Sequence, residues 1–154
     1  MDDSKDASPT KLDLNIEDLT AVVVDAAFHL HQALGPGLLE IVYESLLVKS
    51  LEQRRLVVER QKSVSFDFDG MHFDDGLRVD MLVNGLLVVE LKSVENLAPV
   101  HFKQVLTYLR GMNLSLGLLI NFGSASFKEG CKRIVNNHNA FVGSRLRVNK
   151  NETS

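Results

Sequence analysis

The chain has 154 residues, of which 45% are apolar, and its formal net charge is −3 at pH 7. These values fit one domain with a hydrophobic core and exclude a largely disordered chain. The single cysteine, Cys131, excludes an intramolecular disulfide and favours a reducing, cytoplasmic location. The acidic first residues do not resemble a secretory signal, and no apolar run approaches the ~20 residues that cross a bilayer, so we expect no membrane association.

The first third of the chain predicts two helices. After a flexible tail over residues 1–14, Asn15 is suited to cap a helix over 16–34, in which apolar residues recur every three or four positions. A Gly-Pro-Gly turn at 35–37 ends this helix and leads into a second helix over 38–55. The residues expected on the buried face of the second helix are Leu39, Val42, Tyr43, Leu46, Leu47 and Leu51.

The remaining sequence alternates between strand and helix signals. In chain order we predict strands over 57–68, 71–83 and 86–94, a helix over 99–110, a strand over 114–120 and a helix over 126–136. The order α-α-β-β-β-α-β-α indicates an α/β domain over residues 15–140, with a mixed central sheet flanked by helices. A short strand is expected from residue 139, and residues 141–154 read as a C-terminal tail.

Charge is distributed unevenly along the chain. Residues 1–90 carry 8 Lys and Arg against 17 Asp and Glu, whereas residues 91–154 carry 9 against 3. A basic half beside an acidic half suits a protein that brings a phosphate-binding surface to a carboxylate-rich metal site. Asymmetry of this kind is also common on solvated surfaces, so it carries little weight alone.

Three charged residues lie on the predicted hairpin: Asp80, then Glu90 and Lys92. Glu90 and Lys92 are two residues apart on a strand, so their side chains point to one face. The strand around them is otherwise aliphatic, and burying an ion there costs several kcal/mol unless the ion is paired or binds a metal. The pattern is compatible both with a structural ion pair and with a functional site.

As a functional site, this trio indicates metal-dependent phosphodiester chemistry. Two carboxylates supply the oxygen ligands that Mg²⁺ or Mn²⁺ prefers, and the backbone carbonyl of Leu91 is a further candidate ligand. Such a metal polarises a phosphate and lowers the pKa of a bound water. The Lys92 ammonium could orient that water or stabilise charge that develops on the phosphate.

A shared metal also predicts the form of the hairpin loop. A two-residue turn at Asn84-Gly85 would pair Asp80 with Val89 and put it on the face opposite Glu90. A three-residue loop over 83–85, with Gly85 in the left-handed region, would pair Asp80 with Val88 and bring both carboxylates to one face. We therefore predict an odd-length loop or a bulge, and a separation of about 4–6 Å between the nearest carboxylate oxygens.

The trio resembles the core motif of the PD-(D/E)XK nucleases, although Val79 stands where the usual proline precedes the aspartate. Residues 37–43, Gly-Leu-Leu-Glu-Ile-Val-Tyr, are similar to the motif that names the GxxExxY protein family, a branch of that superfamily. Further segments that fit this family are 33–37, 58–61, 89–92, 99–101, 119–123 and 132–135. The resemblance extends from about residue 16 to 136.

The resemblance implies that Glu40 is a helix-borne acidic residue that joins Asp80 and Glu90 at the metal. It also implies that Gln104 faces the site from the next helix, because Gln104 and Tyr108 match the QxxxY motif of RecB-like nucleases, and residues four apart share a helix face. Alternatively, Glu40 only stabilises the start of its helix through the helix dipole, and Gln104 is an ordinary polar cap. Tyr43 is more simply a core residue whose hydroxyl is hydrogen-bonded.

The function implied by the resemblance is a Mg²⁺- or Mn²⁺-dependent nuclease that hydrolyses the phosphodiester bonds of DNA or RNA. Its catalytic residues would be Asp80, Glu90, Lys92, Gln104 and Glu40. The alternative is a module on a nuclease fold that binds nucleic acid or a protein without turnover. A homodimer or a protein partner is compatible with a domain of this size.

Overall fold

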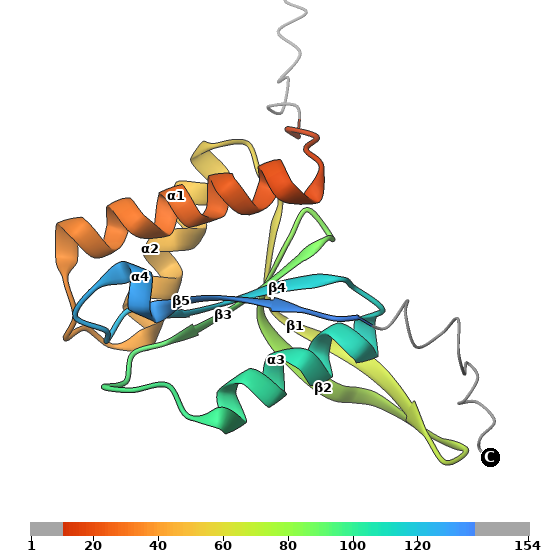
Figure 1. Ribbon diagram of the computed structural model, residues 1–154. Coiled ribbons are helices and arrows are strands. Elements are labelled where there is room, and N and C mark those ends of the chain that lie inside the picture. The colour runs from red at the N-terminus through yellow and green to blue at the C-terminus, as the bar shows by residue number, and fades with distance from the viewer. Residues whose placement is uncertain (1–10, 138–154) are drawn as a thin grey trace, which may run out of the picture.

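A computed structural model describes residues 11–137 of the protein and shows a five-stranded mixed sheet with helices on both faces (Figure 1). The elements in chain order are α1 (Ile16–Leu34), α2 (Glu40–Gln53), β1 (Val58–Phe68), β2 (Met71–Val83), β3 (Leu87–Lys92), α3 (Pro99–Met112), β4 (Leu116–Asn121), α4 (Phe127–Gly130) and β5 (Cys131–Val135). The strands lie side by side in sequence order; β3 and β4 are parallel, and the other neighbours are antiparallel. The predicted fold class is confirmed.

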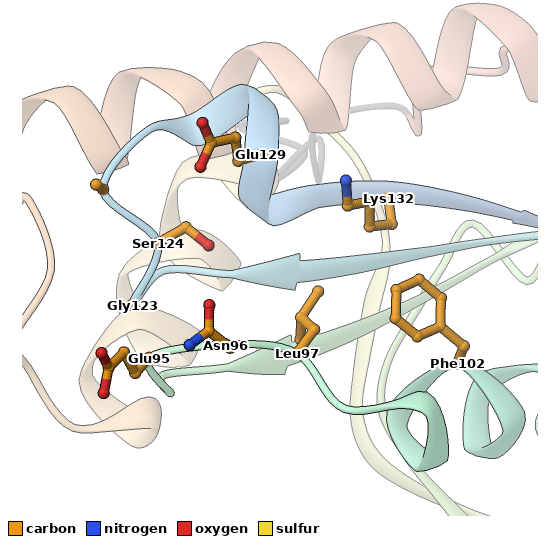
Figure 2. Close-up of a pocket in the computed structure, with 9 residues that line it drawn as sticks. Glu95, Asn96, Leu97, Phe102, Gly123, Ser124, Glu129 and Lys132 are labelled. Carbon is orange, nitrogen blue, oxygen red and sulfur yellow. The ribbon is translucent and has the colours of Figure 1, made fainter.

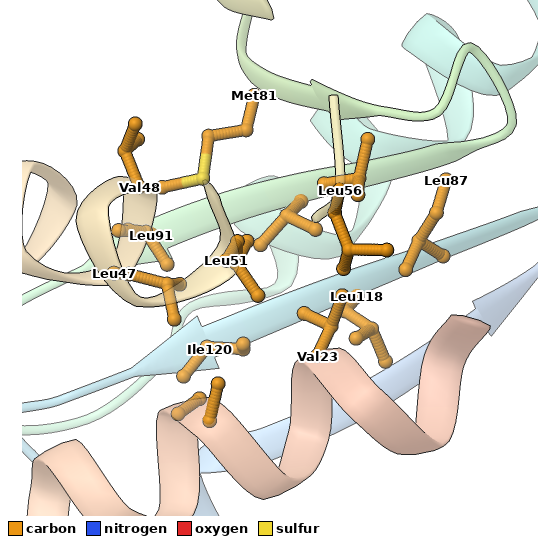
Figure 3. Packing of buried hydrophobic residues seen from close by; sticks show 14 of the residues in the cluster. Val23, Leu47, Val48, Leu51, Leu56, Met81, Leu87, Leu91, Leu118 and Ile120 are labelled. Atoms are coloured by element: carbon orange, nitrogen blue, oxygen red, sulfur yellow. The ribbon is translucent and has the colours of Figure 1, made fainter. Parts of the chain in front are cut away.

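Each face of the sheet buries its own hydrophobic cluster. Helices α1 and α2 cover one face, where Leu47, Leu51 and Ile120 are among the residues packed between them and the sheet (Figure 3). Helix α3 covers the other face with Val105, Tyr108 and Leu109. Because β3 and β4 are covered on both faces, their sequences are almost entirely apolar. A charged side chain on β3 is therefore an exception that requires a physical reason.

The first two helices form largely as predicted. The Asn15 side chain accepts a hydrogen bond of 2.9 Å from the Asp18 amide, and Gly35 ends α1 with a φ of 65°. Helix α2 begins at Glu40, two residues later than predicted. The predicted buried face of α2 is partly wrong, because Leu39 and Val42 are exposed. The buried residues of α2 are Tyr43, Glu44, Leu47, Val48 and Leu51.

The helix predicted over residues 126–136 is wrong. Only one helical turn forms, after which Cys131–Val135 becomes β5 and pairs antiparallel with β4. The change occurs at Gly130, where an added Cβ would lie 2.4 Å from the Asn121 carbonyl oxygen. The chain therefore passes too close to the end of β4 for an ordinary helical residue. Burial raises the pKa of the half-buried Cys131 thiol to about 11, which fits a packing role.

The N-terminal segment joins the domain before α1. Leu12 and Leu14 pack against the cluster under α1 and α2, and the Leu12 amide donates a 2.9 Å hydrogen bond to the Arg55 carbonyl. The predicted strand from residue 139 and the tail 141–154 lie outside the described residues. Within residues 11–137, no helix is long and apolar enough to span a membrane.

Candidate active site

The loop between β2 and β3 decides whether the predicted site can form. Asn84 and Gly85 both have positive φ, at 53° and 68°, and the Leu86 amide donates a 3.0 Å hydrogen bond back to Val83. Because Val83 pairs with Leu87, Leu86 is an additional loop residue. The predicted odd-length loop is confirmed, although it spans residues 84–86 instead of 83–85.

Met81 pairs with Val89, so the next residues along the two antiparallel strands, Asp80 and Glu90, lie directly opposite each other. The predicted pairing of Asp80 with Val88 is therefore wrong, but its consequence is the same: the two carboxylates share a face. The strand pairing ends at this point. Beyond Val89, strand β3 continues along β4, where Lys92 pairs with Asn121, and no longer pairs with β2.

The two carboxylates take the place of the missing backbone partners between β2 and β3. The Asp80 amide donates to Glu90 Oε1 at 3.3 Å, and the Leu91 amide donates to Asp80 Oδ2 at 2.9 Å. Each side chain thus holds the backbone of the opposite strand. These reciprocal bonds fix both carboxylates at the fork where the strands separate, which is the kind of preorganisation that a metal or catalytic site requires.

The fork is electrostatically unfavourable when it is unliganded. Burial, followed by repulsion from Asp80, raises the pKa of Glu90 to about 8. Burial also raises the pKa of Asp80, with a further contribution from the negative charge of Glu44. Two carboxylates that resist ionisation together are a site whose charge a cation would balance.

Lys92 lies at the same fork. Its Nζ is 3.9 Å from Glu90 Oε2, and the side chain is 19% exposed. The ammonium is therefore close enough to interact with the carboxylate pair, yet it retains access to solvent. This position suits a group that meets a negatively charged ligand arriving from outside.

A second polar network, which sequence reasoning missed, supports Asp80 from α2 and β1. Glu44 is buried, and its Oε2 accepts hydrogen bonds from Arg60 at 2.8 and 3.1 Å. The Gln61 amide nitrogen donates to Glu44 Oε1 at 2.9 Å and to Asp80 Oδ1 at 3.4 Å. Glu44 and Asp80 are thus connected through Gln61.

The backbone is unusual where this network meets Asp80. Gln61 lies opposite Asp80 in the register and has a φ of 47°, which is uncommon for a residue other than glycine. On β2, Val79 and Leu82 face α3, whereas Met81 and Val83 face α1 and α2. The regular alternation of β2 therefore changes at Asp80. The sequence signal was Glu44 itself, a carboxylate next to Tyr43 on the apolar face of α2.

The other predicted site residues occupy different positions. Leu91 is buried on β3 between Glu90 and Lys92, and its amide binds Asp80. Glu40 is exposed in the first turn of α2, and among the described residues no contact joins it to Asp80 or Glu90. The turn before it is tied to the end of β3, because Ser93 Oγ donates a 2.7 Å hydrogen bond to the Leu38 carbonyl.

The α3 side of the fork contains Tyr108 and Gln104. Burial, and then the charges of Glu90 and Asp80, raise the pKa of Tyr108 to about 12, and the Gln104 side chain beside it opposes this shift. Both residues line a groove of about 350 Å³ between α3 and β2, together with Arg78 and Thr107. The groove thus passes Tyr108, the neighbour of the fork, although Asp80, Glu90 and Lys92 do not line it.

A larger hollow of about 440 Å³ lies at the carboxyl ends of β3 and β4 (Figure 2). Glu95, Glu129 and Lys132 line it, but Asp80, Glu90 and Lys92 do not. Near it, Asn121 ties the ends of the two strands together: its side chain accepts from the Val94 amide at 3.0 Å and donates to the Val94 carbonyl at 2.9 Å. With charges of both signs and no catalytic pattern, this hollow is not the candidate active site.

The fork fits a divalent cation that retains water ligands. Within residues 11–137, no three His, Cys, Asp or Glu side chains are gathered in a way that could hold a metal without other ligands. Mg²⁺ commonly binds through one or two carboxylates and keeps several waters. Asp80 and Glu90 supply two carboxylates whose pKa values are raised mainly by burial, and the charge of Asp80 raises that of Glu90 further. The donor set thus fits Mg²⁺ or Mn²⁺ better than a fully protein-liganded metal.

The five-stranded mixed sheet with helices on both faces is consistent with a nuclease-type fold, and a family comparison agrees. The family model of the PD-(D/E)XK nuclease superfamily matches residues 17–134. The chain therefore belongs to the PD-(D/E)XK nuclease superfamily. Comparison with curated proteins and with solved structures gave no match.

Proposed function

We propose that the protein is a divalent-metal-dependent nuclease that hydrolyses phosphodiester bonds at the Asp80–Glu90 fork. The observation that carries this proposal is the pair of carboxylates, Glu90 buried and Asp80 half-buried, each hydrogen-bonded to the opposite strand where β2 and β3 separate. A surface ion pair would not need this geometry. Membership of the nuclease superfamily supports the same chemistry.

The metal, Mg²⁺ or Mn²⁺, would be held by Asp80 and Glu90, with the Leu91 carbonyl and Glu40 as further proposed ligands. When bound, it would supply a polarised phosphate and a more acidic water. Lys92 stabilises the negative charge that develops on the phosphate, because its ammonium lies at the fork and can reach solvent. Gln104 orients the water or a phosphate oxygen from the α3 side, where it lies beside Tyr108.

We further propose that the chain belongs to the GxxExxY branch. The motif has a physical basis in this protein: Gly37 has a φ of 117°, and the Tyr43 hydroxyl donates to the Gly35 carbonyl at 2.5 Å and accepts from the Leu38 amide at 3.2 Å. Gly37 and Tyr43 thus hold the turn from which Glu40 projects. The structural interpretation of Tyr43 is confirmed, because it is fully buried and stacked on Phe122.

Nucleic acid, DNA or RNA, is the proposed substrate, and a reducing cytoplasmic location is proposed on the basis of the single cysteine. We also propose that the protein forms a homodimer or binds a protein partner. Size-exclusion chromatography with light scattering tests this proposal.

The experiment is a cleavage assay on single-stranded DNA, duplex DNA and RNA with Mg²⁺, Mn²⁺ or EDTA. We expect cleavage with metal, none with EDTA, and none for Asp80→Asn. Glu59→Gln is the matched control, because Glu59 is a half-exposed carboxylate of the same sheet that pairs with Lys62. Binding of nucleic acid without cleavage in any metal would favour the alternative, a non-catalytic binding module.

A further inference from the structure

The β1–β2 hairpin extends past the rest of the sheet and presents an unusual apolar face (Figure 1). Phe66 pairs with Phe73, and Phe68 pairs with Met71. Paired residues, and residues two apart on a strand, point to the same face, so these four side chains form one surface, here called the aromatic face. Phe68 is 69% exposed, Met71 61% and Phe73 41%.

The rings of the aromatic face are already aligned with each other. Phe66 lies 6.0 Å from Phe73 and 6.4 Å from Phe68, centroid to centroid, and the interplanar angles are 30° and 5°. The β-bulge that follows Val64 brings Gly76 against Phe66, where an added Cβ would lie 2.8 Å from the Phe66 Cβ. The fold therefore maintains exposed, nearly parallel rings, which is the geometry on which flat bases stack.

The aromatic face is continuous with the candidate active site. Phe66, Asp67 and Phe68 of β1 line a groove of about 620 Å³ with Thr107, Arg110 and Gly111 of α3. Thr107 also lines the groove that contains Gln104 and Tyr108 beside the fork. From Gln104 to Arg110 the helix rises by about 9 Å, which is spanned by a few nucleotides of one strand.

Two arginines along this path are available for phosphates. Arg78 lines the groove beside the fork, and Arg110 lines the groove beside the aromatic face. Both are exposed, and neither guanidinium forms an ion pair with another residue of the range 11–137. Alternating rings and free cationic groups are typical of surfaces that bind unpaired nucleic acid.

The acidic residues of the hairpin limit what the surface can bind. Asp67 pairs with His72 across the strands, at 2.6 Å, and also lines the groove beside the aromatic face. Asp69 lies in the turn, and Asp74 also contacts His72 at 3.0 Å. A duplex would bring a second phosphate backbone towards these carboxylates and would keep its bases inaccessible for stacking. A single strand on the aromatic face brings no second phosphate backbone towards these carboxylates, and its bases are accessible for stacking.

We propose that the aromatic face, with Arg78 and Arg110, binds unpaired nucleotides, so that single-stranded or locally unpaired nucleic acid is the substrate class of this site. This inference rests on the proposed nuclease function, but it concerns binding and is measurable without cleavage.

The test is fluorescence anisotropy with the full chain in EDTA and a fluorescein-labelled strand of about 20 nucleotides. The strand is presented as a single strand, as a duplex, and with abasic sites. We expect the single strand to bind more tightly than the duplex. We expect Phe68→Leu to weaken single-strand binding about 5- to 150-fold, the range of one lost base stack, and Phe68→Tyr to retain it. If Phe68→Leu and the wild type bind the abasic strand equally well, the result would support stacking of a base on Phe68.

Val57→Ala is the matched control, because Val57 is an exposed apolar residue before the opposite end of β1. Equal binding of the single strand by wild type and Phe68→Leu would overturn the inference, even if Mg²⁺-dependent cleavage were intact. If the wild type binds the single strand through Phe68 but shows no Mg²⁺-dependent cleavage, the proposed nuclease function is contradicted instead. A change in oligomeric state in Phe68→Leu without a change in oligonucleotide binding would assign this face to protein contacts and would also overturn the inference.

Discussion

Glu90 gives a quantitative test of the buried fork. The residue is 4% exposed, and burial with repulsion from Asp80 raises its pKa from 4.5 to about 8. A carboxyl whose pKa is higher in the folded state holds a proton that the unfolded chain releases. The contribution of Glu90 to the free energy of unfolding is therefore fully present below pH 4.5 and is lost as the pH rises towards 8.

The size of this effect follows from the two pKa values. Between pH 5 and pH 7 the unfolded carboxyl is mainly ionised, whereas the folded Glu90 remains mainly protonated in the absence of metal. At about 1.4 kcal/mol per pKa unit, Glu90 lowers the free energy of unfolding by about 2–3 kcal/mol over this interval. Glu90→Gln removes the titration but keeps an oxygen that accepts from the Asp80 amide.

The assay is urea unfolding of wild type and Glu90→Gln at pH 5 and pH 7 in EDTA. We expect the wild type to lose about 2–3 kcal/mol more than the variant between these values. Mg²⁺ at pH 7 should restore stability to the wild type and have little effect on the variant, because a ligand stabilises only the state that binds it. The exposed control Glu59→Gln should retain the wild-type pH dependence. Equal pH dependence in wild type and Glu90→Gln would refute the reasoning.

Three further substitutions test other parts of the site. Lys92→Met should retain Mn²⁺ binding but lose cleavage. Its stability should be unchanged or slightly higher, because the substitution replaces a poorly solvated charge with an apolar chain. A large loss of Mn²⁺ affinity in calorimetry would show instead that Lys92 holds the carboxylates in place. Glu44→Ala should destabilise the fold by about 1–3 kcal/mol in urea, because it leaves Arg60 without its buried partner, and an unchanged unfolding midpoint would remove Glu44 from the supporting network. Tyr43→Phe should cost about 1–2 kcal/mol, because the Gly35 carbonyl loses its hydroxyl donor; no loss in thermal unfolding would contradict the proposed role of the motif.

The parts of the fold that could be predicted from the sequence have strong local signals. Asn15 and Gly35 mark the ends of α1 through a side-chain cap and a positive φ, and both effects depend on neighbouring residues. The hairpin loop was predictable for a different reason. The Asn-Gly pair indicated the turn, and the requirement that Asp80 and Glu90 share a face indicated an additional residue. Local conformational preferences could not show that the additional loop residue is Leu86 instead of Val83.

The parts that were mispredicted are set by contacts between distant segments. Cys131–Val135 has no strong strand pattern, and its pairing with β4 makes it a strand. Similarly, the buried face of α2 includes Glu44, whose partners Arg60 and Gln61 come from β1. The periodicity of apolar residues favoured Leu39 and Val42 instead. A single sequence indicates which side chains are apolar, but not which buried carboxylate finds a partner.

The shared metal site is the central claim, and Mn²⁺ calorimetry of wild type, Asp80→Ala and Glu90→Ala tests it most directly. Both carboxylates lie at one fork, so we expect the wild type to bind Mn²⁺ and each variant to lose that binding while its circular dichroism spectrum remains that of a folded protein. Unchanged Mn²⁺ affinity in either folded variant would contradict the claim.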